Sequence, residues 1–152
     1  MAIDTVLLAV GPDEGDPTDR LIEETVELAE PTDATVVIAH VLERDTYEEL
    51  ATKLGFDPDR EEVFPTEVVR RDALVRRIAE ELEAAGIATE VRGAVGDRGE
   101  EIVRLAADVG ADSVVVGGRR RSPTGKAVFG SVAQDVMLSS PCPVTFVRGD
   151  TL

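Results

Sequence analysis

The sequence has few of the residues on which many site chemistries depend. Of its 152 residues, one is cysteine, one is histidine, none is tryptophan, and aromatic residues make up 3%. A single cysteine, Cys142, cannot form an internal disulfide, so nothing points to an oxidising compartment. Together with the lone His40 it is too little for a zinc site built from cysteine and histidine. The aromatic content is too low for a platform that stacks RNA bases.

Long apolar runs are also missing. No run approaches the roughly 20 residues that a membrane-spanning helix needs, so we expect no membrane partner. The first eight residues lack a basic region followed by a long apolar stretch, which is the pattern of a secretory signal. We therefore expect a cytoplasmic protein.

Basic residues are scarce relative to acidic ones. Lys and Arg total 16 against 31 Asp and Glu, which gives a net charge of −15, and the lysines are Lys53 and Lys126. Such a chain should repel nucleic acid and anionic lipid, so we expect no nucleic-acid partner. The acidic residues are spread along the chain, and concentrated salt would screen their mutual repulsion. This pattern favours a halophilic, archaeal source over the alternative of an ordinary acidic cytosolic protein.

What the sequence does contain is enough apolar residue, 43%, for one domain spanning residues 1–152 with one core. Apolar runs alternate with helical patterns, which is typical of a parallel α/β sheet. We expect an α/β fold, a doubly wound three-layer α/β/α sandwich with an open five-stranded parallel sheet. The predicted strands are 5–10, 36–41, 87–92, 113–117 and 144–147.

Cap and breaker residues place the predicted helices between these strands. The first helix is expected over 17–30, and the second from Pro65 to Gly86, where glycine ends it. Capping boxes at 97–100 and at 131–134 predict the starts of the last two helices. The acidic stretch 42–64 is expected to be a solvated excursion with a short helix at most.

The loop after the fourth strand has the one strong reversal of charge. Between Ser113 and Gln134 there are four basic residues and no acidic one. Gly130 and Ser131 open a helix, whose free N–H groups and positive dipole end favour an anion such as phosphate. The alternative is that Ser131 merely caps its helix and the arginines pair with surface carboxylates. On residue chemistry alone both interpretations stay open.

This segment resembles the signature of the universal stress protein family, Gly-x2-Gly-x9-Gly-Ser/Thr, which also follows a fourth strand. Further similarities cover nearly the whole chain. They include the His40-Val41 end of the second strand, Gly96, Ala111-Asp112 before the fourth strand, and the segment 141–144 before the last one.

The resemblance implies an adenine nucleotide alpha hydrolase-like fold. It also implies a stress-response regulator that binds ATP, with Mg, or another adenine nucleotide. Gly117 matches the first signature glycine, Gly130 and Ser131 match the closing pair that holds phosphate, and Val41 matches the position whose backbone contacts adenine. The full set of candidate binding residues is Val10, Gly11, Val41, Gly117, Gly118, Arg119, Arg120, Gly130, Ser131 and Val132.

Two positions depart from the family pattern. Arg120 replaces the second signature glycine, where it either blocks close approach to phosphate or adds a bidentate grip on it. Gly11 replaces the acidic residue that usually ends the first strand, and Asp13 lies two residues on. These departures favour an alternative, a stress or scaffold protein that binds no nucleotide. In the family, homodimers commonly form through the last strand, here Val144–Val147.

A third alternative, a slow ATP hydrolase, has the least support. No nucleophile–base pair is identifiable, and Asp13 is the one candidate for a base or metal ligand, so no catalytic residue and no metal ligand is assigned. Gly125-Lys126 does not complete a phosphate-binding Walker motif, because position 120 is arginine and position 127 is alanine. His40 ends a buried strand, which favours a packing role over catalysis.

Overall fold

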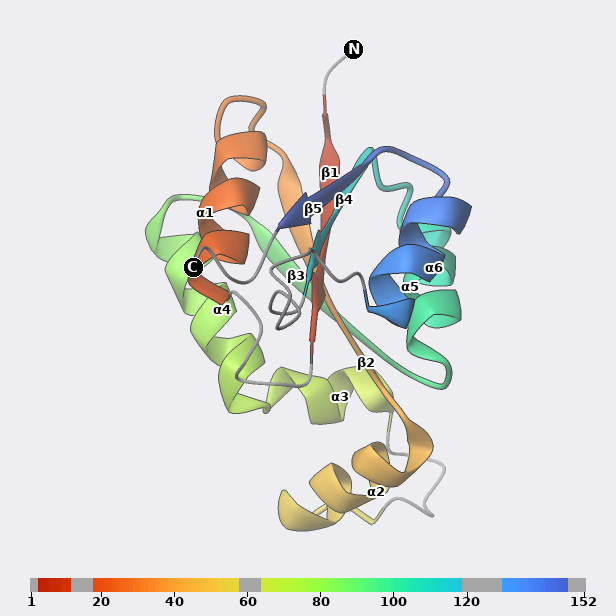
Figure 1. The fold of residues 1–152 in the computed structure, drawn as a ribbon. Helices are drawn as coiled ribbons and strands as arrows, with labels where there is room; N and C mark the ends of the chain where they lie inside the picture. Colours follow the sequence, from red (N-terminus) through yellow and green to blue (C-terminus); the bar gives the residue numbers. More distant parts are fainter. Residues whose placement is uncertain (1–2, 12–17, 58–63, 119–129, 148–152) are drawn as a thin grey trace, which may run out of the picture.

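The computed structural model describes residues 3–11, 18–57, 64–118 and 130–147, and it shows strands enclosed by helices (Figure 1). The elements in chain order are β1 (Thr5–Val10), α1 (Thr18–Ala29), β2 (Thr35–Leu42), α2 (Arg44–Lys53), α3 (Pro65–Arg70), α4 (Ala73–Ala84), β3 (Thr89–Val95), α5 (Arg98–Asp108), β4 (Ser113–Gly117), α6 (Ser131–Ser139) and β5 (Val144–Val147).

The five strands form one parallel sheet in the order β3-β2-β1-β4-β5. The strand β1 therefore lies in the centre, with β2 on one side and β4 on the other. This order reverses direction at β1, as the doubly wound prediction requires. The predicted fold class is confirmed, and the carboxyl ends of all strands lie at one edge.

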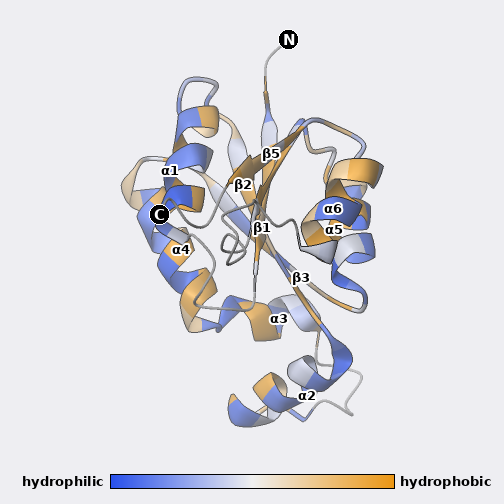
Figure 2. Ribbon diagram, in the orientation of Figure 1, coloured by the Kyte–Doolittle hydropathy of each residue, from blue (hydrophilic) through white to orange (hydrophobic). Residues whose placement is uncertain are grey.

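Each face of the sheet has its own core. In β1, Val6 and Leu8 point toward the layer formed by α1 to α4, whereas Leu7 and Ala9 point toward α5 and α6. Residues on both faces are almost fully buried, which explains why the strand reads as a continuous apolar run rather than an alternating one. Figure 2 shows hydrophobic residues along the central strands β1 and β2, and alternating hydrophobic and hydrophilic residues along the helices that cover them.

The prediction of one helix from Pro65 to Gly86 is wrong. The chain forms two helices, α3 and α4, separated at Arg71 and Asp72. Asp72 is extended and its side chain accepts a hydrogen bond from the Leu74 N–H, so it is the N-cap of α4. The buried apolar residues of α3 and α4 follow one another at helical spacing across the break, so the sequence pattern did not reveal that α4 starts anew.

The excursion after β2 contains the ten-residue helix α2, which lies beyond the carboxyl end of β2 (Figure 1). This agrees with the expectation of a short helix. The acidic residues of α2, which are Asp45, Glu48 and Glu49, are exposed as predicted, whereas Asp59, Glu61 and Glu62 lie outside the described residues. In the same helix Tyr47 is 3% exposed and Ala51 is fully buried. The excursion is therefore anchored to the core beneath its solvated face.

One of the two predicted capping boxes is confirmed as a cap. Asp97 caps α5 by accepting a hydrogen bond from the Glu100 N–H at 3.0 Å. The box at 131–134 is wrong, because Gly130 is the N-cap of α6 and Ser131 is its first helical residue. A serine inside the first turn lies one position too late to close the turn as an N-cap does.

The third strand is displaced from its predicted position. It runs over Thr89–Val95 and not 87–92. Ile87 is buried, but it lies in the turn that leaves α4, where its N–H donates to the Leu82 carbonyl. Near the strand's far end, Gly93 lies against the first turn of α3, and its N–H donates to the Thr66 hydroxyl at 3.0 Å.

Among the described residues, exposed ion pairs neutralise few of the acidic groups. Arg77 contacts Asp19 and Glu81, and Arg104 pairs with Glu101 at 2.8 Å. Such exposed pairs each contribute at most about 1 kcal/mol, whereas the chain carries a net charge of −15. The folded state therefore concentrates unbalanced negative charge on its surface.

We expect the unfolding temperature to rise as KCl is increased from about 0.1 M to about 2 M, because salt screens repulsion between surface carboxylates. Differential scanning calorimetry measures this directly. NaCl at matched ionic strength is the control and should give the same trend. An unfolding temperature that stays level or falls would contradict the role assigned to surface repulsion.

Candidate functional site

Three strand ends and one helix start meet at the carboxyl edge of the sheet. Val10 ends β1 and Gly11 follows it, and β1 pairs with β2 so that Val10 lies opposite His40. Val41 is 1% exposed, and its side chain belongs to the core beneath α5 and α6. Val10 is 3% exposed on the opposite face. Any ligand contact from these two valines must therefore come from the backbone, which is what the family resemblance implies for Val41.

Gly117 and Gly118 hold the end of β4 against β5. Gly117 pairs with Val147, and the Gly118 N–H donates to the Val147 carbonyl at 2.8 Å. A Cβ atom at Gly118 would lie 1.9 Å from Cζ of Phe146. The packing of that ring gives Gly118 a structural reason to be glycine, whether or not a ligand approaches it.

The N-terminus of α6 faces the same edge, because a helix between parallel strands begins where the preceding strand ends. Gly130 has no side chain to cap the helix, and its carbonyl accepts the first helical bond, from the Gln134 N–H at 3.0 Å. The first N–H groups of a helix have no intrahelical acceptor. Ser131 is exposed beside them and Val132 is half-buried. This start combines oriented N–H donors, a hydroxyl and the positive end of the helix dipole.

Eight of the ten predicted binding residues lie at the ends of β1, β2 and β4 or at the start of α6, on the carboxyl side of the sheet: Val10, Gly11, Val41, Gly117, Gly118, Gly130, Ser131 and Val132. Arg119 and Arg120 lie outside the described residues, as does Asp13. Their predicted parts in the site stay predictions. Within the described ranges, no three His, Cys, Asp or Glu residues converge as a metal-binding group.

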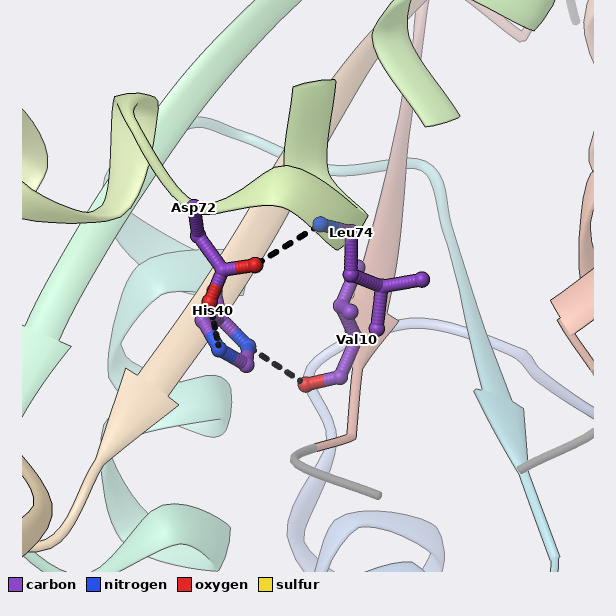
Figure 3. Close-up of polar contacts among 4 residues, drawn as sticks. All are labelled: Val10, His40, Asp72 and Leu74. Atoms are coloured by element: carbon purple, nitrogen blue, oxygen red, sulfur yellow. Dashed lines mark hydrogen bonds and ion pairs between the residues drawn. The ribbon is translucent and has the colours of Figure 1, made fainter. Parts of the chain in front are cut away.

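Sequence reasoning missed a polar network next to this edge (Figure 3). The His40 ring is 2% exposed, with Nδ1 3.1 Å from the Val10 carbonyl oxygen. Its Nε2 lies 3.5 Å from Oδ2 of Asp72, while Oδ1 of Asp72 accepts from the Leu74 N–H at 2.8 Å. His40 is buried near the end of β2, as predicted, and its ring also makes polar contacts with Val10 and Asp72.

The network lowers the pKa of Asp72 below its ordinary value. The hydrogen bond from His40 is the largest cause, the bond from the Leu74 N–H adds to it, and partial burial opposes both. Asp72 is therefore a carboxylate at neutral pH. A sequence signal existed, since aspartate before an apolar helical stretch is a preferred N-cap, but the continuous stripe from α3 hid it.

Comparison with known proteins gives this edge its context. The model of the Universal stress protein family matches residues 3–148. The chain belongs to this family. A universal stress protein of Mycolicibacterium smegmatis is 37% identical over 79 residues, which cover 51% of this chain and 61% of that protein. The chain thus spans less than two thirds of that relative's length in the match.

Solved universal stress proteins have the same fold. One from Archaeoglobus fulgidus is 25% identical with a TM-score of 0.70, covering 95% of this chain and 98% of that one. An Archaeoglobus fulgidus structure in complex with dAMP is 21% identical, with a TM-score of 0.65 over 97% of this chain and 99% of that one. An Arabidopsis thaliana family member with AMP bound is 16% identical, with a TM-score of 0.63 over 97% and 93%.

At the carboxyl edge of this universal stress protein, the described residues supply backbone groups, the Ser131 hydroxyl and the N-terminus of α6. His40, the one histidine in the sequence, is turned toward Val10 and Asp72 and is buried. None of the described helices is long and apolar enough to cross a membrane.

Proposed function

We propose that this universal stress protein binds an adenine nucleotide at the carboxyl edge of its sheet, as a stress-response regulator rather than an enzyme. The phosphates lie at the first turn of α6 and the adenine lies against the backbone of Val41. ATP with Mg is the ligand that the signature favours. Arg119 and Arg120 are then placed in sequence to add positive charge beside the phosphates.

One observation carries the proposal. The helix α6 begins on the edge where β1, β2 and β4 end, and its N-cap residue, Gly130, has no side chain to accept from the first N–H groups. In open α/β sheets this edge beside the switch point is where ligands bind. Its oriented N–H groups favour an anion. Relatives of the same fold with dAMP and AMP bound support adenine nucleotides as the anion's class.

Replacing Ser131 with alanine is expected to weaken nucleotide binding about tenfold, which corresponds to the loss of one hydrogen bond to a charged group. Titration calorimetry with ATP and magnesium, and with AMP, would measure this in concentrated KCl. Ser139→Ala is the matched control, because Ser139 is exposed at the opposite end of the same helix. It should bind like the wild type.

Two results would contradict the proposal. If ATP, ADP and AMP all give neither binding heat nor a thermal shift with the wild type, the chain binds no adenine nucleotide. If Ser131→Ala and Ser139→Ala bind equally well, the phosphates do not lie at the first turn of α6. Phosphate release that depends on Ser131 would instead support the slow hydrolase.

The edge strand β5 favours a second candidate function, a homodimeric scaffold. Among the described strands β5 pairs with β4 alone, and Val144, Thr145 and Phe146 are only partly buried. An apolar strand with one free edge tends to pair with another chain. A dimer in light scattering combined with no nucleotide binding would favour this function over the first.

A further inference from the structure

The buried ring of His40 connects two parts of the molecule that lie far apart in the sequence. It lies on the face of β2 that also carries Ile38 and Leu42, whose side chains belong to the core beneath α1 to α4. On one side its Nδ1 meets the carbonyl of Val10, at the end of β1. On the other its Nε2 meets Asp72, the N-cap of α4 (Figure 3).

Both neighbours of the ring are hydrogen-bond acceptors. A backbone carbonyl cannot donate, so Nδ1 must carry a hydrogen to bond Val10. Asp72 is ionised, and its oxygens also can only accept. A neutral ring with its hydrogen on Nδ1 would direct the Nε2 lone pair at a carboxylate. A ring with hydrogens on both nitrogens satisfies both neighbours, and Asp72 balances its buried charge.

We propose that His40 is a positioning residue: a doubly protonated ring, held by Asp72, that fixes the end of β1 for nucleotide binding. The identity of the ligand rests on the proposed function, whereas the contacts of the His40 ring do not. Val10 ends β1 at the candidate site with Gly11 directly after it, and Val41 follows His40 directly. The ring contacts the Val10 carbonyl on the face of the sheet opposite to the Val41 side chain. It can therefore fix the positions of the ends of β1 and β2 without touching the nucleotide.

The lone histidine makes the ring directly observable. A nitrogen–proton correlation spectrum of the tag-free protein contains ring signals from His40 alone. We expect two proton-bearing ring nitrogens in the wild type at neutral pH. In Asp72→Asn the amide can donate to Nε2 and asparagine still caps the helix. We therefore expect this variant to have one proton-bearing nitrogen, Nδ1, and the native fold.

The same variant tests the link to the site. We expect Asp72→Asn to weaken AMP binding at least about fivefold, the lower end of typical coupling between sites. Glu81→Gln is the matched control, because it removes one carboxylate charge from α4 by breaking an exposed pair with Arg77. It should leave both the ring spectrum and AMP binding unchanged.

Each outcome separates the two proposals. A wild-type ring with a single proton-bearing nitrogen overturns the doubly protonated assignment. If the ring signature holds but Asp72→Asn binds AMP as tightly as the wild type, the positioning role is wrong while nucleotide binding stands. If the wild type binds no AMP, the proposed function fails and the positioning role fails with it, even though the ion pair remains visible in the ring spectrum.

Discussion

Leu8→Ala is expected to lower the free energy of unfolding by about 4 kcal/mol, within the range of about 2–5 kcal/mol found when a buried leucine is truncated. Leu8 is completely buried. It lies in β1, which is bonded on both sides, to β2 and to β4, at this residue. A central strand held along both edges cannot move to fill the space, so the cavity should persist. Urea unfolding at fixed KCl would measure the loss.

The matched control is Leu138→Ala. Leu138 is 79% exposed on α6, so the same truncation removes little buried area and should change stability by less than about 0.5 kcal/mol. Equal losses in the two variants would mean that β1 is not the enclosed centre of the sheet.

Gly93→Ala is expected to cost about 1–3 kcal/mol, the usual penalty for adding volume to a packed contact. A Cβ atom there would lie 2.7 Å from the Pro65 carbonyl oxygen and 2.8 Å from Cγ2 of Val69. The first of these atoms belongs to the backbone of α3, so rotation of a side chain cannot relieve the clash. The helix must move away from β3, which should also lengthen the bond from the Gly93 N–H to Thr66.

Arg92→Ala provides the comparison on the same strand. Arg92 is about half exposed and pairs with Glu90 at 2.9 Å, an exposed pair worth little. Its removal should change stability by less than about 0.5 kcal/mol. Thermal unfolding followed by circular dichroism would rank the two variants, and a Gly93→Ala protein as stable as Arg92→Ala would refute the close contact.

The sequence predicted most of the sheet because four of its five strands are marked by apolar residues. The strands 5–10, 113–117 and 144–147 were predicted with their observed bounds, and each is dominated by apolar residues. The third strand was misplaced because Ile87, although buried, contributes from a turn. The residues of β3 itself alternate only weakly between exposed and half-buried. Periodicity cannot separate these two sources of burial.

The candidate site was predictable as far as topology determines it. Parallel strands bring the ends of β1, β2 and β4 to one edge, so Val10, Val41 and Gly117 could be placed there from their order alone. The pairing of His40 with Asp72 could not, because it depends on where α4 begins and on how that helix packs over β2. Because the sequence pattern did not reveal Asp72 as the N-cap of α4, it also did not reveal Asp72 as the partner of His40.

The central place of β1 has a consequence for how the chain folds during synthesis. The β1, β2 and β3 strands are complete once residue 95 has emerged, but the other edge of β1 pairs with β4, which ends at Gly117. Until then one edge of β1 has unpaired backbone N–H and C=O groups, on a strand whose residues 6–10 are all apolar. Such an edge is the kind of surface on which chains aggregate. Asp112 accepts from the N–H groups of Asp4 and Thr5, so the same late segment also fastens the beginning of the chain. A ribosome pause between β3 and β4 would prolong the aggregation-prone stage, and rapid translation through α5 would shorten it.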